Sequence, residues 1–131
     1  MIVVDCSYAL AMVMPDEKRP ASLAQVVAGR LLVPSIWPFE VANAFRSAVR
    51  RARFTSEEML AVCGRLEALQ FEMASLHDAA VRQHYLASLS HGLTAYDAAY
   101  LELALQRRGP LATLDAALAQ AAAQAGVQVI H

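Results

Sequence analysis

Short apolar runs alternate with longer amphipathic segments along this chain, and the alternation predicts strands followed by helices. Strands are predicted at 2–4, 31–33, around Phe71, at 111–113 and at 127–130. Helices are predicted over 7–13, 21–28, from Pro38 onward, from Thr55 to Ala68, and over 76–89, 94–108 and 115–125. Strands that alternate with helices in this way predict an α/β fold, a short and mostly parallel sheet flanked by helices in three layers. With 131 residues, the chain is expected to form a single domain over 1–131.

Capping signals fix several helix ends. Ser7 is expected near the N-cap of the first helix, and Pro38 suits the first position of its helix. Thr55 and Glu58 have the spacing of a capping box. Gly126 is expected to end the last helix.

Four acids occupy the positions at which such a sheet binds ligands, beyond the carboxyl ends of its strands. Asp5 closes the first strand, and Asp115 follows the strand at 111–113. Glu40 and Asp97 each lie in the first turn of a predicted helix. We therefore expect the four side chains to meet at one edge of the sheet.

Each acid also has an ordinary explanation. Asp97 forms a possible capping box with Thr94, and Glu40 is placed to complement a helix dipole. Asp115 suits an N-cap and Asp5 a turn. None of these explanations accounts for all four acids together. Four neighbouring carboxylates repel one another, and a hard divalent cation, Mg²⁺ or Mn²⁺, removes that conflict.

The order and surroundings of these acids resemble PIN-domain ribonucleases, and more narrowly the VapC-type toxins of bacterial toxin–antitoxin pairs. The matching segments are Ile2-Val3-Val4-Asp5-Cys6-Ser7, Val33-Pro34, Glu40-Val41-Ala42-Asn43-Ala44, His91 to Tyr100, and Leu111-Ala112-Thr113-Leu114-Asp115. The stretch Thr94-Ala-Tyr-Asp-Ala-Ala-Tyr-Leu101 is the most specific of them. The resemblance covers nearly the whole chain.

The resemblance implies a role for each residue. Asp5, Asp97 and Asp115 would ligate Mg²⁺ or Mn²⁺, and Glu40 would bind the metal or orient the attacking water. Nearby hydroxyl and amide groups that would support these carboxylates are Ser7, Thr113 and Asn43. For Ser7 a helix N-cap, and for Asn43 a solvated helix position, stay open as alternatives.

The resemblance also implies partners. They are an RNA substrate, a small antitoxin that blocks the site, and a second copy of the chain in a homodimer. An excess of apolar residues is expected to serve such an interface, with the antitoxin-facing groove formed by the early helices and the helix at 55–68.

Charge and composition add a little to this interpretation. The net charge is −1, but arginines recur as Arg46, Arg50 and Arg53 on one side of a predicted helix. They are candidates for RNA contact, with a solvated helix face as the alternative. No apolar run approaches the roughly 20 residues that cross a bilayer. Cys6 and Cys63 are far apart in the sequence, which suits a protein of the reducing cytoplasm better than a disulfide-bonded scaffold.

Other functions compete with this one. A phosphotransfer enzyme with Asp5 as its nucleophile would be expected to carry a second Asp two residues on, where Ser7 stands. A catalytically silent module of the same fold and a housekeeping RNA-processing nuclease also stay open. His77, His84 and His91 recur every seven residues, about 10.5 Å apart along a helix, and are expected at a surface or interface rather than on one metal.

Overall fold

A parallel five-stranded sheet forms the centre of the molecule. The computed structural model describes residues 1–75 and 80–131. The strands are β1 (Ile2–Val4), β2 (Leu31–Pro34), β3 (Glu72–Ala74), β4 (Leu111–Ala112) and β5 (Val129–Ile130), in the order β3-β2-β1-β4-β5. In the register of the central strand, Val3 pairs with Leu32 on one side and Leu111 on the other. The predicted α/β architecture is confirmed.

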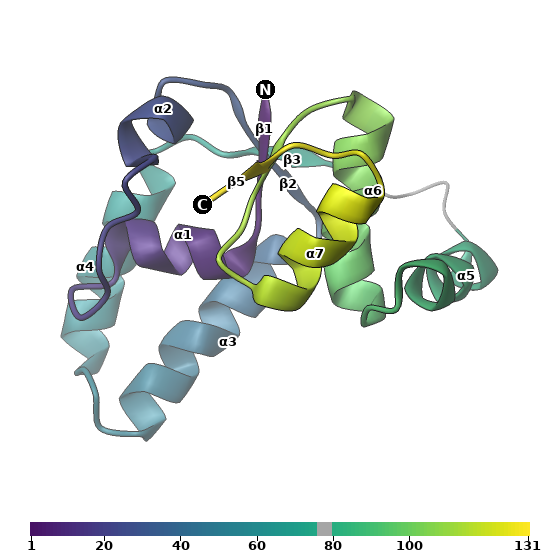
Figure 1. The fold of residues 1–131 in the computed structure, drawn as a ribbon. Helices are drawn as coiled ribbons and strands as arrows, with labels where there is room; N and C mark the ends of the chain where they lie inside the picture. The colour runs from purple at the N-terminus through teal and green to yellow at the C-terminus, as the bar shows by residue number, and fades with distance from the viewer. Residues whose placement is uncertain (76–79) are drawn as a thin grey trace.

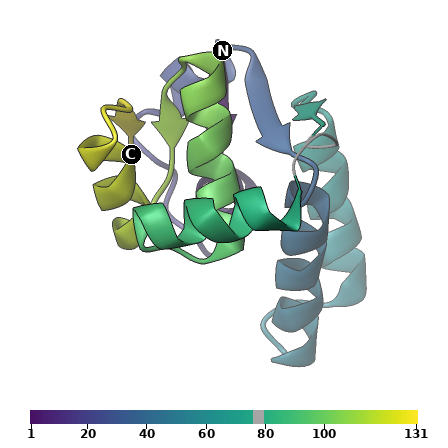
Figure 2. The same ribbon diagram turned by 90° about the vertical axis from the view of Figure 1, so that its right-hand side faces the viewer.

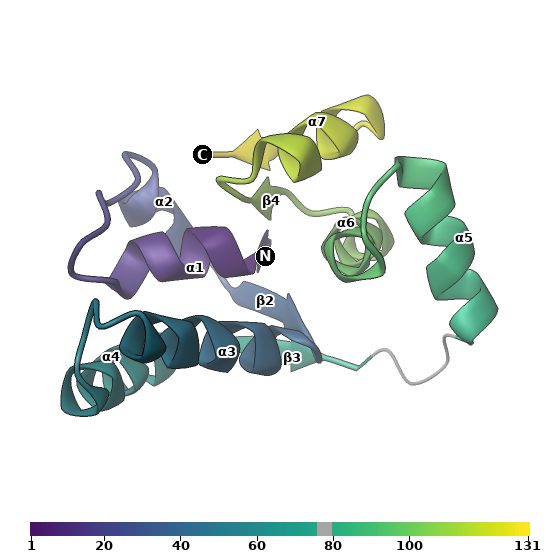
Figure 3. The same cartoon turned by 90° about the horizontal axis from the view of Figure 1, so that it is seen from below.

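Seven helices of the described residues cover the two faces of this sheet. They are α1 (Cys6–Val13), α2 (Leu23–Val27), α3 (Trp37–Arg50), α4 (Ser56–Glu67), α5 (Val81–His91), α6 (Ala95–Arg107) and α7 (Ala116–Gln124) (Figure 1). Figure 3 shows α1 on one side of the strands and α6 on the other, with α5 outside α6. Helix α6 packs against β1 and β2, and α1 packs against α3 and α4. The arrangement is a three-layer sandwich.

Burial on both faces explains the composition of the strands. Val3, Val4 and Val33 are fully buried, as are Leu101 of α6 and Leu111 of β4. A parallel strand covered by helices on both sides has no polar face, so it appears in the sequence as a continuous apolar run. No helix in the described part of the chain is long and apolar enough to cross a bilayer.

Several helix starts differ from the predictions, and α3 begins at Trp37, one residue before Pro38. Asp5, not Ser7, is the N-cap of α1, because the Asp5 carboxylate accepts the backbone N–H of Tyr8. The expected capping box of Thr55 and Glu58 is present at α4. The predicted helix over 76–89 is observed from Val81 to His91, and its expected start and His77 lie outside the described residues.

Helices α3 and α4 lie side by side and extend beyond the sheet (Figure 2). The face of α3 toward α1 and α4 is apolar, with Val41, Phe45 and Ala48 buried on it. Apolar residues in the first helices and in the helix at 55–68 were expected to include an excess for an interface, but Met12, Met14, Trp37, Met59 and Leu66 are buried. Phe39 and Leu60 are 79% and 68% exposed.

Candidate active site

The four predicted acids lie at the carboxyl ends of the strands. Asp5 directly follows β1, and Asp115 follows β4 and is the N-cap of α7. Glu40 and Asp97 lie in the first turns of α3 and α6. We call these four residues the acidic cluster.

The members of the acidic cluster influence one another electrostatically. The charge of Asp115 acts on both Asp5 and Asp97. The charges of Asp5 and Asp97 act on Glu40. The topology thus brings together carboxylates from four segments of the chain, at one end of the sheet.

Asp5 receives more hydrogen bonds than the other members of the cluster. Its side chain is only 4% exposed, yet both oxygens are satisfied. Oδ1 accepts the backbone N–H of Tyr8 at 2.8 Å, and Oδ2 accepts the hydroxyl of Thr113 at 2.6 Å. The Ser7 hydroxyl lies 2.8 and 2.9 Å from the two oxygens. These donors compensate for the loss of water that burial imposes on a carboxylate.

The two hydroxyls also link β1 to the loop after β4. Thr113 is fully buried, and its oxygen accepts the backbone N–H of Asp115 at 3.0 Å. The Ser7 oxygen accepts the N–H of Leu114 at 2.9 Å. Ser7 and Thr113 therefore lie where the resemblance places them, in contact with the carboxylate of Asp5.

Glu40 has one strong partner, in a different helix. The hydroxyl of Tyr100, in α6, donates to Oε1 of Glu40 at 2.7 Å. Tyr100 is 1% exposed and Glu40 is half-buried. The bond joins two residues 60 positions apart in the sequence.

The ordinary explanations hold only in part for the two remaining acids. Oδ1 of Asp115 accepts the N–H of Leu118 at 2.8 Å, so Asp115 does cap α7. The hydroxyl oxygen of Thr94 accepts the N–H of Asp97 at 3.1 Å. Among the described residues the reciprocal bond from the backbone of Thr94 to the Asp97 carboxylate is not formed, so the capping box is incomplete.

Burial and mutual repulsion shift the pKa of three acids in the same direction. Desolvation raises the pKa of Asp5 more than its hydrogen bonds with Thr113, Tyr8 and Ser7 lower it. Desolvation and the charges of Asp97 and Asp5 raise the pKa of Glu40, although the Tyr100 bond opposes them. Desolvation, with the charge of Asp115, raises the pKa of Asp97. The cluster carries more negative charge than this site readily holds.

Cys6 lies beside the cluster and is not a reactive thiolate. Burial, followed by the charges of Glu40 and Asp5, raises the pKa of its thiol to about 12. The thiol is therefore protonated at neutral pH, which makes it a poor metal ligand and nucleophile.

The donor chemistry of the cluster suits a hard divalent cation, because carboxylate oxygens are its preferred ligands and their repulsion would be relieved. As positioned, however, no three His, Cys, Asp or Glu side chains within residues 1–75 and 80–131 are close enough to hold one ion. Mg²⁺ keeps several water ligands in most protein sites. Binding here requires water to complete the coordination or the more exposed carboxylates to rotate inward.

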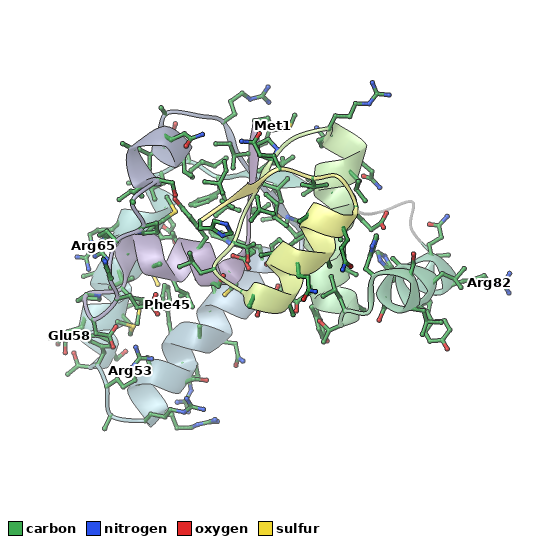
Figure 4. All side chains as sticks on the ribbon, viewed as in Figure 1. Met1, Phe45, Arg53, Glu58, Arg65 and Arg82 are labelled. Carbon is green, nitrogen blue, oxygen red and sulfur yellow. The ribbon has the colours of Figure 1, made fainter. Side chains whose placement is uncertain are left out.

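The remaining predicted residues lie apart from the cluster. Asn43 is exposed on α3, as in the solvated alternative. Arg46 and Arg50 are also exposed on α3, whereas Arg53 follows that helix and bonds Asp16 at 2.5 Å. Figure 4 shows Arg53 near the protruding end of α3 and α4. Arg50 is ten residues from Glu40, about 15 Å along the helix.

Tyr100 is the residue of this site that sequence reasoning missed. The stretch from Thr94 to Leu101 contains it, one turn after Asp97, but the motif gives it no role. A tyrosine within an apolar helix face needs a partner for its hydroxyl when buried, which was the available signal. The identity of that partner depends on how α3 packs near α6.

Comparisons with known proteins agree with the fold. The PIN domain family matches residues 2–124. Ribonuclease VapC3 from Pyrobaculum aerophilum is 34% identical over 124 residues, which span 91% of this chain and 92% of the relative. The crystal structure of PAE2754 from Pyrobaculum aerophilum matches with a TM-score of 0.75 at 21% identity, covering 98% of this chain and 82% of that one, and supports the fold alone. The chain therefore belongs to the PIN-domain family.

Proposed function

We propose that this chain, as one nuclease domain over 1–131, is a Mg²⁺- or Mn²⁺-dependent endoribonuclease that acts in the cytoplasm as the toxin of a VapBC-like pair. The observation that carries the proposal is the acidic cluster, in which desolvation and mutual repulsion raise the pKa of three carboxyls. The name of the relative, Ribonuclease VapC3, supports RNA as the substrate class.

The hydrogen bonds and exposure of each acid indicate its role. Asp5 is held by three hydrogen-bond donors and is the metal ligand whose position is fixed. Asp97 and Asp115, which are more exposed, complete the ligand set for a cation. Glu40 keeps Oε2 for the metal or for the attacking water, because Tyr100 bonds Oε1. A divalent cation bound there would make water more acidic and offset the charge that grows on the phosphate.

The direct test is RNA cleavage by the purified chain, free of any partner. We expect cleavage with Mg²⁺ or Mn²⁺, none with EDTA, and a loss of at least 100-fold in Asp5→Asn and Asp97→Asn. Glu57→Gln is the matched control, because Glu57 is an exposed acid in the first turn of α4, away from the cluster. Cleavage that survives EDTA or both substitutions would refute the proposal.

An apolar groove between α3 and α4 is the proposed antitoxin site. It has a volume of about 370 Å³ and is lined by Trp37, Pro38, Val41, Ala42, Phe45, Cys63, Leu66, Glu67, Gln70 and Phe71. A second hollow continues along the same helices past Met59 and Leu60. Such a groove fits the apolar face of an amphipathic segment.

Leu60 allows this partner proposal to be tested without damage to the core, since it is 68% exposed. Expression of the chain should arrest growth, and the small gene upstream should relieve the arrest. Leu60→Glu should abolish that relief while the chain still cleaves RNA. Met73→Glu, on the edge strand β3, is the control for adding an acid at an exposed apolar position. Growth arrest that no upstream neighbour relieves would favour a housekeeping nuclease.

RNA binding and self-association complete the proposal. Arg46 and Arg50 offer exposed guanidinium groups for phosphates, whereas Arg53 is engaged by Asp16. Exposed aliphatic side chains on α5, namely Val81, Leu86 and Leu89, supply a surface for a homodimer. Light scattering over a range of protein concentrations measures the oligomeric state, and a monomer at all of them would remove the dimer from the proposal.

A further inference from the structure

The bond between Tyr100 and Glu40 differs from the other contacts of the acidic cluster, because it joins two helices. Tyr100 lies in α6, which packs against β1 and β2, and Glu40 lies in the first turn of α3. The distance between the phenol oxygen and Oε1 is 2.7 Å. A bond of this length to a carboxylate is typical of charge-assisted hydrogen bonds.

Among the described residues, the carboxylates of the cluster are bonded by neutral donors and by no cationic side chain. The hydroxyls of Ser7 and Thr113 bond Asp5, and that of Tyr100 bonds Glu40. The ion pairs found within the described residues, Arg30–Glu72, Arg53–Asp16 and His91–Glu102, include no member of the cluster. A neutral donor orients a carboxylate without neutralising it, so the negative charge stays available to a metal ion.

Tyr100 can serve only as a donor to Glu40. Burial and the adjacent charge of Glu40 raise the pKa of the phenol far above its ordinary value, so it keeps its proton. The same bond lowers the pKa of Glu40 against the effect of burial and therefore favours the ionised carboxylate.

The bond also makes the two carboxylate oxygens of Glu40 different from each other. Tyr100 bonds Oε1, while no residue in the described ranges donates a hydrogen bond to Oε2. A glutamate side chain has several rotatable bonds, and a free one samples many rotamers. Fixing one oxygen restricts the position of the other, which is the condition for effective catalysis by a positioned group.

We propose that Tyr100 is a positioning residue, whose hydroxyl holds Glu40 so that Oε2 is presented to the metal or to the attacking water. The catalytic role in this inference rests on the proposed function, whereas the hydrogen bond between Tyr100 and Glu40 is seen in the structure. Loss of a group that orients a metal ligand typically costs 10–100-fold in activity or metal affinity. Tyr100→Phe removes the hydroxyl alone and keeps the ring that packs in the core.

A double-mutant cycle with Tyr100→Phe and Glu40→Gln tests whether Tyr100 acts through Glu40. We expect Tyr100→Phe to lower kcat for RNA cleavage by 10–100-fold and to change KM by less than about 2-fold. In the Glu40→Gln background, the same substitution should change kcat by less than about 2-fold. An equal loss in both backgrounds, or no loss in the native background, would overturn the inference.

Calorimetric titration with Mn²⁺ gives a readout that does not depend on cleavage. Tyr100→Phe should weaken Mn²⁺ binding by 10-fold or more in the native background and have little effect beside Glu40→Gln. Tyr85→Phe, at an exposed site on α5, should bind Mn²⁺ as the native chain does. Affinity that is unchanged in Tyr100→Phe would contradict the positioning role.

A stability control separates loss of positioning from loss of structure. Tyr8 is fully buried, and its hydroxyl lies 2.8 Å from that of Ser22, so Tyr8→Phe removes a comparable buried hydroxyl away from Glu40. If Tyr100→Phe unfolds no more easily than Tyr8→Phe, its kinetic loss is not a folding defect. A native chain that neither binds Mn²⁺ nor cleaves RNA would refute both proposals. A native chain that does both, with Tyr100→Phe indistinguishable from Tyr85→Phe, would refute this one alone.

Discussion

Replacing Thr113 by valine removes one hydroxyl from beneath the acidic cluster and nearly preserves the volume of the side chain. Thr113 is fully buried and donates to Oδ2 of Asp5 at 2.6 Å. A hydrogen bond to a charged group contributes about 1.5–3 kcal/mol. The bond that Thr113 accepts from the N–H of Asp115 adds less, because it is a neutral bond at a part-buried position. Thr113→Val should therefore lower the free energy of unfolding by about 2–3 kcal/mol at pH 7, or Tm by about 7–11 °C.

The size of this loss should depend on pH. The Thr113 hydroxyl lowers the pKa of Asp5 against the effect of burial, so it favours the charged carboxylate. Once Asp5 is protonated, the bond is an ordinary neutral one, with a contribution of about 0.5–1.5 kcal/mol. The deficit of Thr113→Val is therefore largest at neutral pH and shrinks as the pH falls through the raised pKa of Asp5.

Urea unfolding between pH 8 and pH 4, in EDTA and at fixed protein concentration, measures this deficit, with the fluorescence of the buried Trp37 as the signal. Thr55→Val is the matched control. Thr55 caps α4 at the surface by accepting a backbone N–H, so its loss of about 1 kcal/mol should be the same at every pH. A deficit of Thr113→Val below about 0.5 kcal/mol, or one that is constant with pH, would refute the reasoning.

Three further predictions concern the metal, the pH and the arginines. Free Mg²⁺ at 100 times its Kd should stabilise the native chain by about 2.7 kcal/mol, or about 10 °C in a thermal melt, and Asp5→Asn should lose that gain. Burial raises the pKa of Asp5 and Glu40 in the folded chain above their ordinary values of 3.8 and 4.5. In EDTA, the contribution of these two groups to stability is therefore fully present at pH values below their ordinary pKa values. That contribution is lost as the pH rises through the raised pKa values of the folded chain. Proton uptake on folding should be measurable in that range, and cleavage should fall as the pH drops through it. Arg46→Gln and Arg50→Gln should raise KM for RNA and flatten its salt dependence, whereas Arg53→Gln, which breaks the bond with Asp16, should mainly lower Tm.

The alternation of apolar runs and amphipathic segments was sufficient to predict the fold. The continuous apolar run at 2–4 is typical of a strand covered on both faces, and β1 is the central strand. The acids were found by position alone, since the end of a strand and the first turn of the following helix are defined by neighbouring residues. Local signals also explain why the N-cap of α1 was predicted near Ser7, because Asp5 and Ser7 are both good N-cap residues.

Contacts between distant segments needed the tertiary structure. The bond from Thr113 to Asp5 joins residues 108 positions apart, and the bond from Tyr100 to Glu40 joins residues 60 apart. The groove between α3 and α4 and the ion pair of Arg53 with Asp16 also depend on contacts between distant segments. The sequence by itself determined which segments form strands and helices and where the acids lie on them, because these depend on residues within a turn or two. Which hydroxyl meets which carboxylate was decided only by the packing of α3 and α6 around the sheet, because helix propensity and hydrophobic periodicity do not specify distances between elements.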